Sequence, residues 1–555
     1  MYLFQIFRSF LPLHNPLGFG ISDLLILAMA ILLSVLLLAK VYVAPTLEKI
    51  SRRPRLCMGL LFAFAIMLRL ALLPQSPAPL PSGADDFSYV LLGDTLAHFR
   101  LANSAHPLHQ FFESVFTLQQ PTYSSIYPLG QGFVLAFGEL LFRSQWAGVL
   151  LSSGIFCALC YWMLRGWAPP IFALAGGMLA IIQFGPLNPW VNSYWGGTVS
   201  ASAGCLVFGS LPRLRESPRL RYGVLLGLGL ALQLLTRPFE SVFLAAAVVV
   251  YVVLAFQSKA IFAAVGITLA AAGLMLAQNK AVTQSWSTMP YMLSRYQYGV
   301  PTTFTFQPNP LPHSALTAEQ ALDYKAQAAI HDSNQSYFQR LGYRFRYLRF
   351  FLLVPLYFVL VFFVPSLRQW QYVWLAGTIA LFALGTNFYP YFYPQYVAAL
   401  TCVFVLFAVQ GLARLPSQAR TLIMLLCIAP FLFWYGLFAW GDTNLLPITA
   451  FQAWHYINRG DPQSRAAIGR QLTSAGGEQL VFVRYSPLHR FEEWIHNAAD
   501  IDAAPIVWAN DLGSVENQKL LDYYPRRNAW LLEPDARPPA LTPYPRESGP
   551  FLTVH

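Results

Sequence analysis

Two adjacent carboxylates, Asp85 and Asp86, occur in a polar stretch of a chain that is otherwise mostly apolar. They come soon after an apolar run of membrane length. The polar stretch that they open reaches Tyr127-Pro128. A carboxylate in such a loop can act as a general base on an acceptor hydroxyl or amine, or hold a metal ion that neutralises a leaving phosphate. A structural alternative is that one of the two caps a helix over 87–99, because Asp is a favoured N-cap residue.

The composition indicates a polytopic membrane protein. Of the 555 residues, 56% are hydrophobic and only 11% are charged, whereas a soluble domain carries about 25% charged residues. The net charge of +11 does not indicate nucleic-acid binding, because the basic residues lie in short loops between apolar runs, as cytoplasmic loops do. The six cysteines fall in or beside apolar segments, so packing is expected rather than metal binding or disulfides.

Apolar runs long enough to span a bilayer, about 20 residues, recur along the chain. The predicted spans are 20–44, 56–74, 146–164, 170–187, 197–211, 222–237, 239–256, 260–278, 347–364, 371–387, 391–412 and 419–440. The shorter run 129–142 contains Glu139 and is predicted to be a re-entrant or interfacial helix. This leaves twelve spans with both termini outside. Short basic loops then lie in the cytoplasm, and the loop with Asp85 lies on the outer side.

Three regions follow from this pattern. Residues 1–55 hold an extra N-terminal span and a basic cytoplasmic loop, and residues 56–440 form the transmembrane domain with outer loops 75–128 and 279–345. Residues 441–555, the tail, have the composition of a soluble domain. In the tail, an amphipathic segment 462–475 precedes predicted strands at 480–483, 505–508 and 529–532, with a helix over 515–521. Strands alternating with helices predict a small parallel α/β unit.

Arg237 and Glu240 are three residues apart at the outer end of a predicted span, which would place both on one face of a helix. They are either an interfacial ion pair or a phosphate site in which the planar guanidinium binds phosphate oxygens. Arg295 is a second phosphate candidate. The tail acids Glu492, Glu493, Asp500 and Asp502 are predicted to form a solvated face, with calcium or acceptor binding as the alternative.

His106 and His109 could be metal ligands, but the proline between them prevents a regular helix. A solvent-facing or substrate hydrogen-bonding role is therefore preferred for His106. The paired glycines Gly196 and Gly197 suit close helix packing or the approach of backbone to a ligand. The tyrosine-rich turn that contains Tyr393 is typical of an aromatic belt, although stacked aromatic rings also line sugar sites.

A family resemblance arises from these motifs. A span followed by an outer loop with an acidic pair, two loop helices and Tyr127-Pro128-Leu129-Gly130 resembles the GT-C glycosyltransferases, which include the protein O-mannosyltransferases and aminoarabinose transferases. The chain is most similar to an uncharacterised bacterial branch of glycosyltransferase-like proteins. The shared motifs are Asp85–Tyr89, Ser104-Ala105-His106-Pro107, Gln119-Gln120-Pro121-Thr122-Tyr123, Asn192-Ser193-Tyr194-Trp195-Gly196-Gly197, Arg237-Pro238-Phe239-Glu240 and Asn497-Ala498-Ala499-Asp500-Ile501-Asp502.

The resemblance implies an all-α membrane fold and a glycosyltransferase of the bacterial inner membrane whose active site and tail face the periplasm. The donor would be a sugar on a polyprenyl phosphate, and the acceptor a lipid, glycan or protein. Asp85 would be the general base, and Asp86 would assist it or bind a divalent metal, Mg or Mn. Arg237, Glu240 and Arg295 would bind the donor phosphate. The expected substrate-binding residues are His106, Tyr123, Asn192, Tyr194, Trp195 and Tyr393.

The sequence also departs from the superfamily pattern. Glu is commoner than Asp86 at the second acidic position, and Asn188 and Asn192 occupy the loop where a second outer acidic residue is usual. Two other functions therefore stay open. A transporter or flippase should show ionisable residues in the middle of its spans and internal repeats, and neither is evident. A non-catalytic envelope assembly factor would keep the fold without the chemistry.

Overall fold

The structure is a computed structural model that describes residues 45–441 and 464–545, apart from 82, 256–258, 334, 488, 490 and 491, together with residues 28 and 31. The predicted first span, 20–44, lies almost entirely outside the described residues. The chain divides into two compact units. The helical unit comprises Met1–Pro79, Pro128–Met275 and Asn334–Arg459, and the loop-and-tail unit comprises Leu80–Tyr127, Leu276–Ser333 and Gly460–His555. Most of each predicted outer loop thus groups with the tail.

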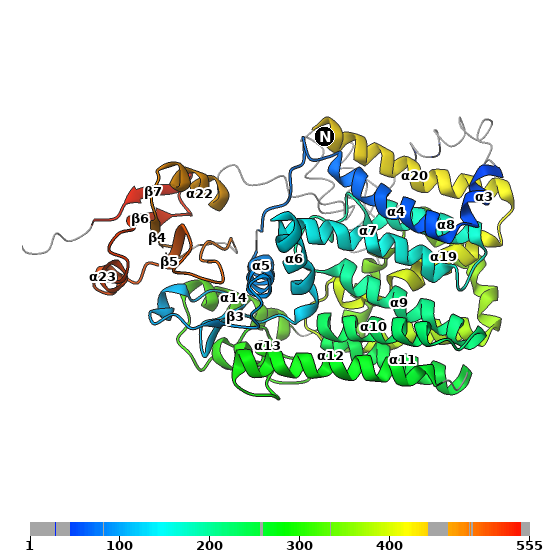
Figure 1. Cartoon of the computed structure of the whole chain (residues 1–555), viewed down its shortest axis with the longest axis horizontal. Coiled ribbons are helices and arrows are strands. Elements are labelled where there is room, and N and C mark those ends of the chain that lie inside the picture. The colour runs from blue at the N-terminus through cyan, green and yellow to red at the C-terminus, as the bar shows by residue number, and fades with distance from the viewer. Residues whose placement is uncertain are drawn as a thin grey trace, which may run out of the picture. The chain divides into compact units, whose positions relative to one another are not determined.

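The helical unit consists of α-helices and short 3-10 turns (Figure 1), of which the helix Ala260–Thr283 continues past Met275 into the loop-and-tail unit. The α-helices are α3 (Pro45–Ser51), α4 (Pro54–Leu70), α6 (Leu129–Phe142), α7 (Gln145–Leu164), α8 (Pro170–Phe184), α9 (Gly197–Glu216), α10 (Leu220–Thr236), α11 (Pro238–Ala255), α12 (Ala260–Thr283), α15 (Tyr337–Arg344), α16 (Leu348–Phe351), α17 (Val354–Phe363), α18 (Trp370–Thr386), α19 (Thr401–Ala413) and α20 (Ser417–Trp440). The 3-10 turns are η2 (Phe345–Tyr347), η3 (Val364–Arg368) and η4 (Pro394–Leu400).

Several of these helices are membrane-like in length and composition. Among the described residues, five helical stretches are long and apolar enough to cross a membrane, and a sixth qualifies if one bent pair counts as a single span. The five are α7, α11, α12, η4 with α19, and α20. Helices α6, α8 and α10 are apolar but shorter. The chain is thus a mostly helical, multi-pass membrane protein, and the count of twelve spans stays a prediction.

One predicted span is not a single helix. The run 347–364 falls on α16 and α17, which belong to the bent pair Tyr337–Phe351 and Val354–Arg368, with an angle of 103° between its two halves. Leu352 between them has extended backbone, and Pro355 stands in the first turn of α17. Proline lacks the amide proton that a helix interior needs and clashes with the preceding turn. The sequence pattern of apolar residues could not show this break.

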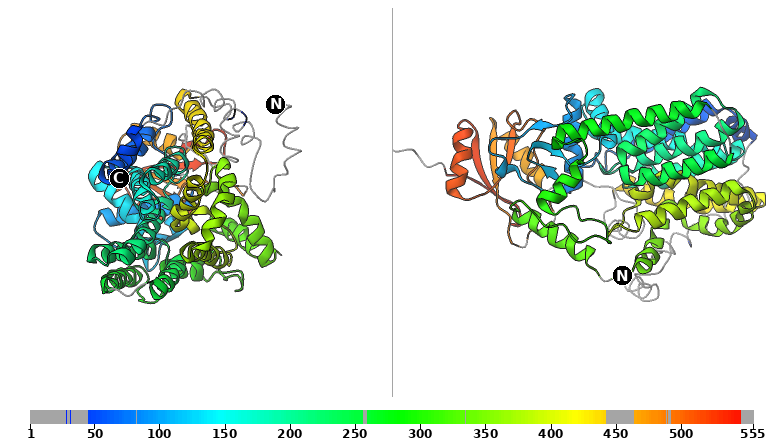
Figure 2. Two further views of the ribbon diagram at one scale, coloured as in Figure 1. Left: turned by 90° about the vertical axis from the view of Figure 1, so that its right-hand side faces the viewer. Right: turned by 90° about the horizontal axis from the view of Figure 1, so that it is seen from below.

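Helices α4, α7, α9 and α10 pack in succession through a large buried core of aliphatic and aromatic side chains. Figure 2 shows them end-on in its left view and along their length in its right view. The six cysteines, Cys57, Cys157, Cys160, Cys205, Cys402 and Cys427, are all buried and free, as the sequence predicted. Gly197 begins α9 where an added Cβ would lie 2.1 Å from a ring carbon of Trp190, and Gly196 before it has a positive φ of 80°. Close packing therefore requires glycine here.

Replacing Gly197 by Ala is expected to lower the unfolding temperature of the detergent-solubilised protein, because a well-packed core responds to an inserted methyl with strain of about 1–3 kcal/mol. Gly266→Ala in α12 is the matched control, since nothing lies within 4 Å of the added Cβ. Replacing a glycine by alanine in a helix interior stabilises the helix by about 0.5–1 kcal/mol. Equal unfolding temperatures for the two variants would show that the contact with Trp190 is not tight.

The loop-and-tail unit contains two sheets. The first outer loop carries α5 (Ala84–Ala97), η1 (His109–Phe112) and a small antiparallel sheet in the order β1 (Asn103–Ser104), β3 (Thr122–Ser125), β2 (Thr117–Leu118). The second outer loop carries α13 (Pro290–Tyr298) and α14 (Ala318–His331). The tail holds α22 (Arg465–Ser474), β4 (Gln479–Val483), β5 (Ile506–Asn510), α23 (Ser514–Tyr523), β6 (Asn528–Glu533) and β7 (Ala540–Pro543).

The tail sheet has the order β5-β4-β6-β7, with β4 parallel to both β5 and β6 and with β7 antiparallel at the edge. Side chains alternate along β4, as they must in a strand. Leu480 and Phe482 pack with α23 on one face, and Val481 and Val483 pack with α22 on the other. The two helices and the strands of this sheet are labelled in Figure 1. The small parallel α/β unit predicted from the sequence is confirmed, while β7 was not predicted and the described residues of the connection from β4 to β5 form no helix or strand.

The first outer loop is part of the tail's core. Leu91 of α5, Phe111 and Phe112 of η1, and Tyr123 of β3 pack in one cluster with Leu480, Phe482 and side chains of α23. Asn510 at the end of β5 donates hydrogen bonds to the carbonyls of Phe111 (3.1 Å) and Glu113 (2.9 Å). The tail and the loop that carries the acidic pair therefore fold as one body.

Candidate functional site

The acidic pair lies in the first turn of a helix, not at its cap. Helix α5 begins at Ala84 with Gly83 as its N-cap residue, and no side chain forms a cap hydrogen bond there. The prediction that Asp85 or Asp86 caps a helix over 87–99 is therefore wrong. First-turn carboxylates are instead favoured by the positive end of the helix dipole.

Asp85 and Asp86 differ in their surroundings. Asp85 is partly exposed and accepts a hydrogen bond from the Tyr127 hydroxyl, whose ring stacks on Tyr89 at 4.1 Å between centroids. Asp86 is only 5% exposed. An acceptor can therefore reach Asp85 more readily than Asp86, which suits the expected division between a base and an assisting residue.

Two further carboxyl groups interact electrostatically with Asp85. They are Asp323 on α14 and Glu493 of the tail, and Glu319 on α14 interacts with both of these. Burial, together with the charge of Asp85, raises the pKa of Asp323 to about 7. Burial raises the pKa of Glu493 well above its usual range, and Glu319, Asp323 and Asp85 add to that shift in this order. The unit thus gathers four acidic side chains from three separate segments.

Glu319 and Asp323 were missed by the sequence reasoning. Thr317 and Gln320 form a capping box at the start of α14, which fixes the orientation of Glu319 in the first helical turn. Residues four apart lie on one helix face, so the spacing of Glu319 and Asp323 was the available signal. Nothing local to the sequence indicated that this face meets the acidic pair.

The prediction of a solvated face for the tail acids is wrong for one residue. Glu492 and Asp500 are exposed, as expected, but Glu493 is only 5% exposed. Asp502 is half-exposed, accepts a hydrogen bond from the Tyr524 hydroxyl and lies 3.4 Å from His106 Nε2. Tertiary packing of the irregular segment after β4 buries Glu493, which no local pattern shows.

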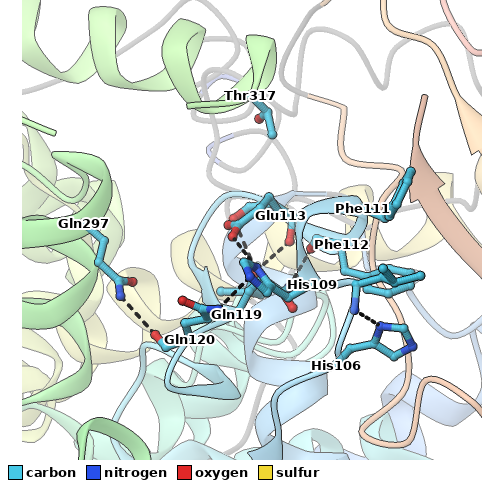
Figure 3. Close-up of polar contacts among 12 residues, drawn as sticks. His106, His109, Phe111, Phe112, Glu113, Gln119, Gln120, Gln297 and Thr317 are labelled. Carbon is cyan, nitrogen blue, oxygen red and sulfur yellow. Dashed lines mark hydrogen bonds and ion pairs between the residues drawn. The ribbon is translucent and has the colours of Figure 1, made fainter. Parts of the chain in front are cut away.

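A polar network beside the cluster joins α14 to the first outer loop, and Figure 3 shows the part of it around His109, Glu113 and Gln120. Glu113 accepts hydrogen bonds from the Tyr298 hydroxyl (2.7 Å) and from Gln320 Nε2 (3.4 Å), and its other oxygen lies 3.6 Å from His109 Nδ1. Burial raises the pKa of Glu113 against these contacts. Gln120 completes the network with a 2.6 Å contact to His109 Nε2. Glu113 thereby positions Gln320, which is the residue next to Glu319.

His106 and Tyr123 attach the loop to the tail. His106 is 6% exposed, with its ring edge-on to Phe112 at 4.8 Å, and burial lowers its pKa. The solvent-facing role preferred for His106 is therefore wrong. The Tyr123 hydroxyl donates to the carbonyl of Asn497 at 2.9 Å. A substrate contact for either side chain stays a prediction. Among the described residues, no group of three His, Cys, Asp or Glu side chains is placed to hold a metal ion.

In the helical unit, Asn192 and Tyr194 hold their own loop. Arg69 is fully buried and donates from Nε to Asn192 Oδ1 (2.8 Å) and from a terminal nitrogen to the carbonyl of Ser76 (2.9 Å). Asn192 in turn donates to two carbonyls of its loop, and the Tyr194 hydroxyl donates to the carbonyl of Pro79 (3.1 Å). Trp195 and Tyr393 are more accessible and meet edge-on at 5.2 Å.

The expected phosphate residues do not share a helix face. Arg237 is the C-cap residue of α10. Pro238 then begins α11, so Glu240 lies in the first turn of a different helix. The Arg237 guanidinium lies 5.2 Å from the centre of the Tyr396 ring, and Glu240 is 2% exposed. Arg295 belongs to the loop-and-tail unit, where it donates to Thr303 Oγ1 at 3.0 Å. Their binding of donor phosphate stays a prediction.

No protein-family model matches the sequence, and no curated protein is similar to it. Solved structures do resemble it. ArnT from Cupriavidus metallidurans in the apo state is 12% identical with a TM-score of 0.47, and the match covers 86% of this chain and 92% of that one.

The oligosaccharyltransferase of Archaeoglobus fulgidus, tethered to an acceptor peptide containing an NVT sequon, is 12% identical with a TM-score of 0.40. The oligosaccharyltransferase AglB from Archaeoglobus fulgidus, in complex with an inhibitory peptide and a dolichol-phosphate, is 11% identical with a TM-score of 0.36. Each of these two matches covers 86% of this chain and 69% of the other.

Proposed function

We propose that the protein is an integral membrane glycosyltransferase that transfers a sugar from a polyprenyl-phosphate donor to an envelope acceptor on the periplasmic side. The proposal rests mainly on the first turn of α5. There a partly exposed Asp85 is hydrogen-bonded by Tyr127 and surrounded by buried carboxyl groups, in a chain whose other unit is made of apolar helices. Twelve spans and a bacterial inner-membrane location belong to the same proposal.

In the proposed reaction, Asp85 takes the proton of the acceptor hydroxyl as its oxygen bonds to the anomeric carbon. The bond from that carbon to the lipid phosphate breaks, and the phosphate leaves with the electron pair. Stabilising the charge that develops on the phosphate should lower the barrier most, and Arg237 is the proposed cation. Because the described acidic and histidine side chains form no metal-binding group, no step is assigned to Mg or Mn.

Transfer in detergent solution tests the proposal. Purified protein is mixed with labelled polyprenyl-phosphate sugars and an envelope extract from a deletion strain, and labelled products are identified by mass spectrometry. We expect a sugar-sized mass to appear on one acceptor, and the same mass to be missing from the envelope of the deletion strain. A flippase or an assembly factor would restore that mass in cells but would not transfer sugar in detergent, where no bilayer separates compartments.

A further inference from the structure

Helix α15 (Tyr337–Arg344) is the first helix after the chain passes from the loop-and-tail unit into the helical unit. A capping box of Ser336 and Gln339 fixes its first turn. None of its eight residues, all of them described, is buried. A helix this short is not stable in water by itself. What its sides contact must therefore hold α15 in place.

One side of α15 is hydrogen-bonded to the end of α18. The Tyr337 hydroxyl donates to the carbonyl of Leu384 at 2.6 Å. The Arg344 guanidinium, seven residues on and therefore on the same side, donates to the carbonyls of Thr386 (2.7 Å) and Tyr389 (2.6 Å). These bonds fix α15 against the last turn of α18 and the turn that follows it.

The end of α18 lies beside the start of α11, one of the candidate membrane spans. A Cβ added at Gly385 would lie 2.2 Å from a ring carbon of Phe243, and the ring of Phe239 meets Tyr389 edge-on at 5.3 Å between centroids. Helix α11 has 18 residues, a length of about 27 Å, which is close to the thickness of the hydrocarbon core. Helix α15 is therefore held at the level where a span ends.

A second side of α15 is apolar and faces away from the protein. Phe338 is 77% exposed, and Phe345, the helical C-cap residue, is 55% exposed. Leu341 lies between them on the same side and is partly exposed. Single exposed apolar residues are ordinary, but residues spaced by three, four and seven positions form one continuous surface along a helix.

The third side of α15 is polar. It carries Gln339, Arg340 and Tyr343, of which Gln339 is exposed and Tyr343 is 43% exposed. At 3.6 residues per turn, the bonded, apolar and polar sides follow one another around the helix. A helix that lies in a membrane interface has this division, because its apolar side chains enter the acyl layer while its polar side chains stay among the headgroups. Tyrosine and arginine are both suited to the headgroup layer.

We propose that α15 lies in the plane of the membrane interface, with Phe338, Leu341 and Phe345 inserted among the acyl chains of the bilayer. Lipid is the occupant of this surface because the apolar exterior of the helical unit continues from it. Leu384, whose carbonyl binds α15, is itself 46% exposed on α18. The inference is independent of the proposed sugar transfer. It assigns α15 as the anchor at which the chain returns from the second outer loop to the membrane.

Spin labels on single introduced cysteines test this position in the full-length protein in lipid nanodiscs. A nitroxide at Phe338→Cys or Phe345→Cys should collide severalfold more often with oxygen, which concentrates in the acyl layer, than with a water-soluble nickel chelate. Gln339→Cys on the polar side is the matched control and should show the reverse order. It keeps the bond from its backbone amide to the Ser336 hydroxyl. Wild-type protein treated with the same reagent gives the background, because its six cysteines are buried.

Two results would overturn the membrane anchor. Labels at both phenylalanine positions that collide mainly with nickel would place this side in water. Labels shielded from both reagents would show that protein covers it, either a second copy of the chain or a partner. If one phenylalanine variant fails to fold, Leu341→Cys reports on the same side of the helix. A wild-type protein that transfers no sugar would contradict the proposed function and leave the collision pattern unchanged.

Discussion

Replacing Asp85 by Asn is expected to reduce sugar transfer by about 10²–10⁴-fold, the usual contribution of a positioned general base. The amide cannot take the acceptor proton, but it has the size of the carboxylate and can still accept the hydrogen bond from Tyr127. The loss should therefore fall on kcat, while KM for both substrates changes little. Initial rates with purified variants in detergent measure this directly.

The variants Asp86→Asn and Tyr127→Phe distinguish the residue that acts as the general base from residues that only position it. Asp86 is buried, so its amide variant should mainly lower the unfolding temperature and reduce the rate less than Asp85→Asn does. Tyr127→Phe removes one hydrogen bond to Asp85 and should raise the pH at which the rate is half-maximal, because a hydrogen bond to the charged form lowers a carboxyl pKa. If Asp86→Asn loses more activity than Asp85→Asn at equal stability, the base is Asp86.

Replacing Arg465 by Met is expected to destabilise the loop-and-tail unit by about 2–4 kcal/mol, the range for losing a buried charged hydrogen-bond network. The Arg465 guanidinium lies between two rings, 4.9 Å from the centre of Phe87 and 4.7 Å from that of Trp508, and donates to the carbonyls of Trp494 and His496. Phe87 adjoins Asp86 on α5, so the loss of this contact should release the acidic pair from the tail. Limited proteolysis and thermal unfolding of the purified protein measure the effect.

Arg465→Lys should give an intermediate loss, because an ammonium cannot bind two carbonyls and stack on two rings as a planar guanidinium does. Arg470→Met on the same helix is the matched control, since Arg470 is exposed, and its unfolding temperature should equal that of the wild type. Equal unfolding temperatures for Arg465→Met and Arg470→Met would show that α5 is held by the apolar core alone.

Local sequence patterns were sufficient to predict most of the helices and strands. Runs of apolar residues predicted most of the helices of the helical unit, and β-branched and aromatic runs predicted strands β4, β5 and β6 within a residue or two. The acidic pair and the glycines at 196 and 197 were found because their types and spacing are unusual in an apolar chain. Helix breaks were predicted less well. The separation of Arg237 from Glu240 and the bend before α17 each depend on a single proline whose effect the apolar pattern hides.

The sequence by itself determined a multi-pass helical membrane protein with an acidic pair in a polar loop and a small parallel α/β tail, because periodicity and composition are local properties of the chain. Only the tertiary structure decided what surrounds that pair. Glu319 and Glu493 reach the cluster from segments far apart in the chain, and Tyr123 bonds to Asn497 across 374 positions. Such contacts form because the first outer loop completes the core of the tail sheet. No sequence pattern within the first outer loop or the tail indicates that these two segments contact each other.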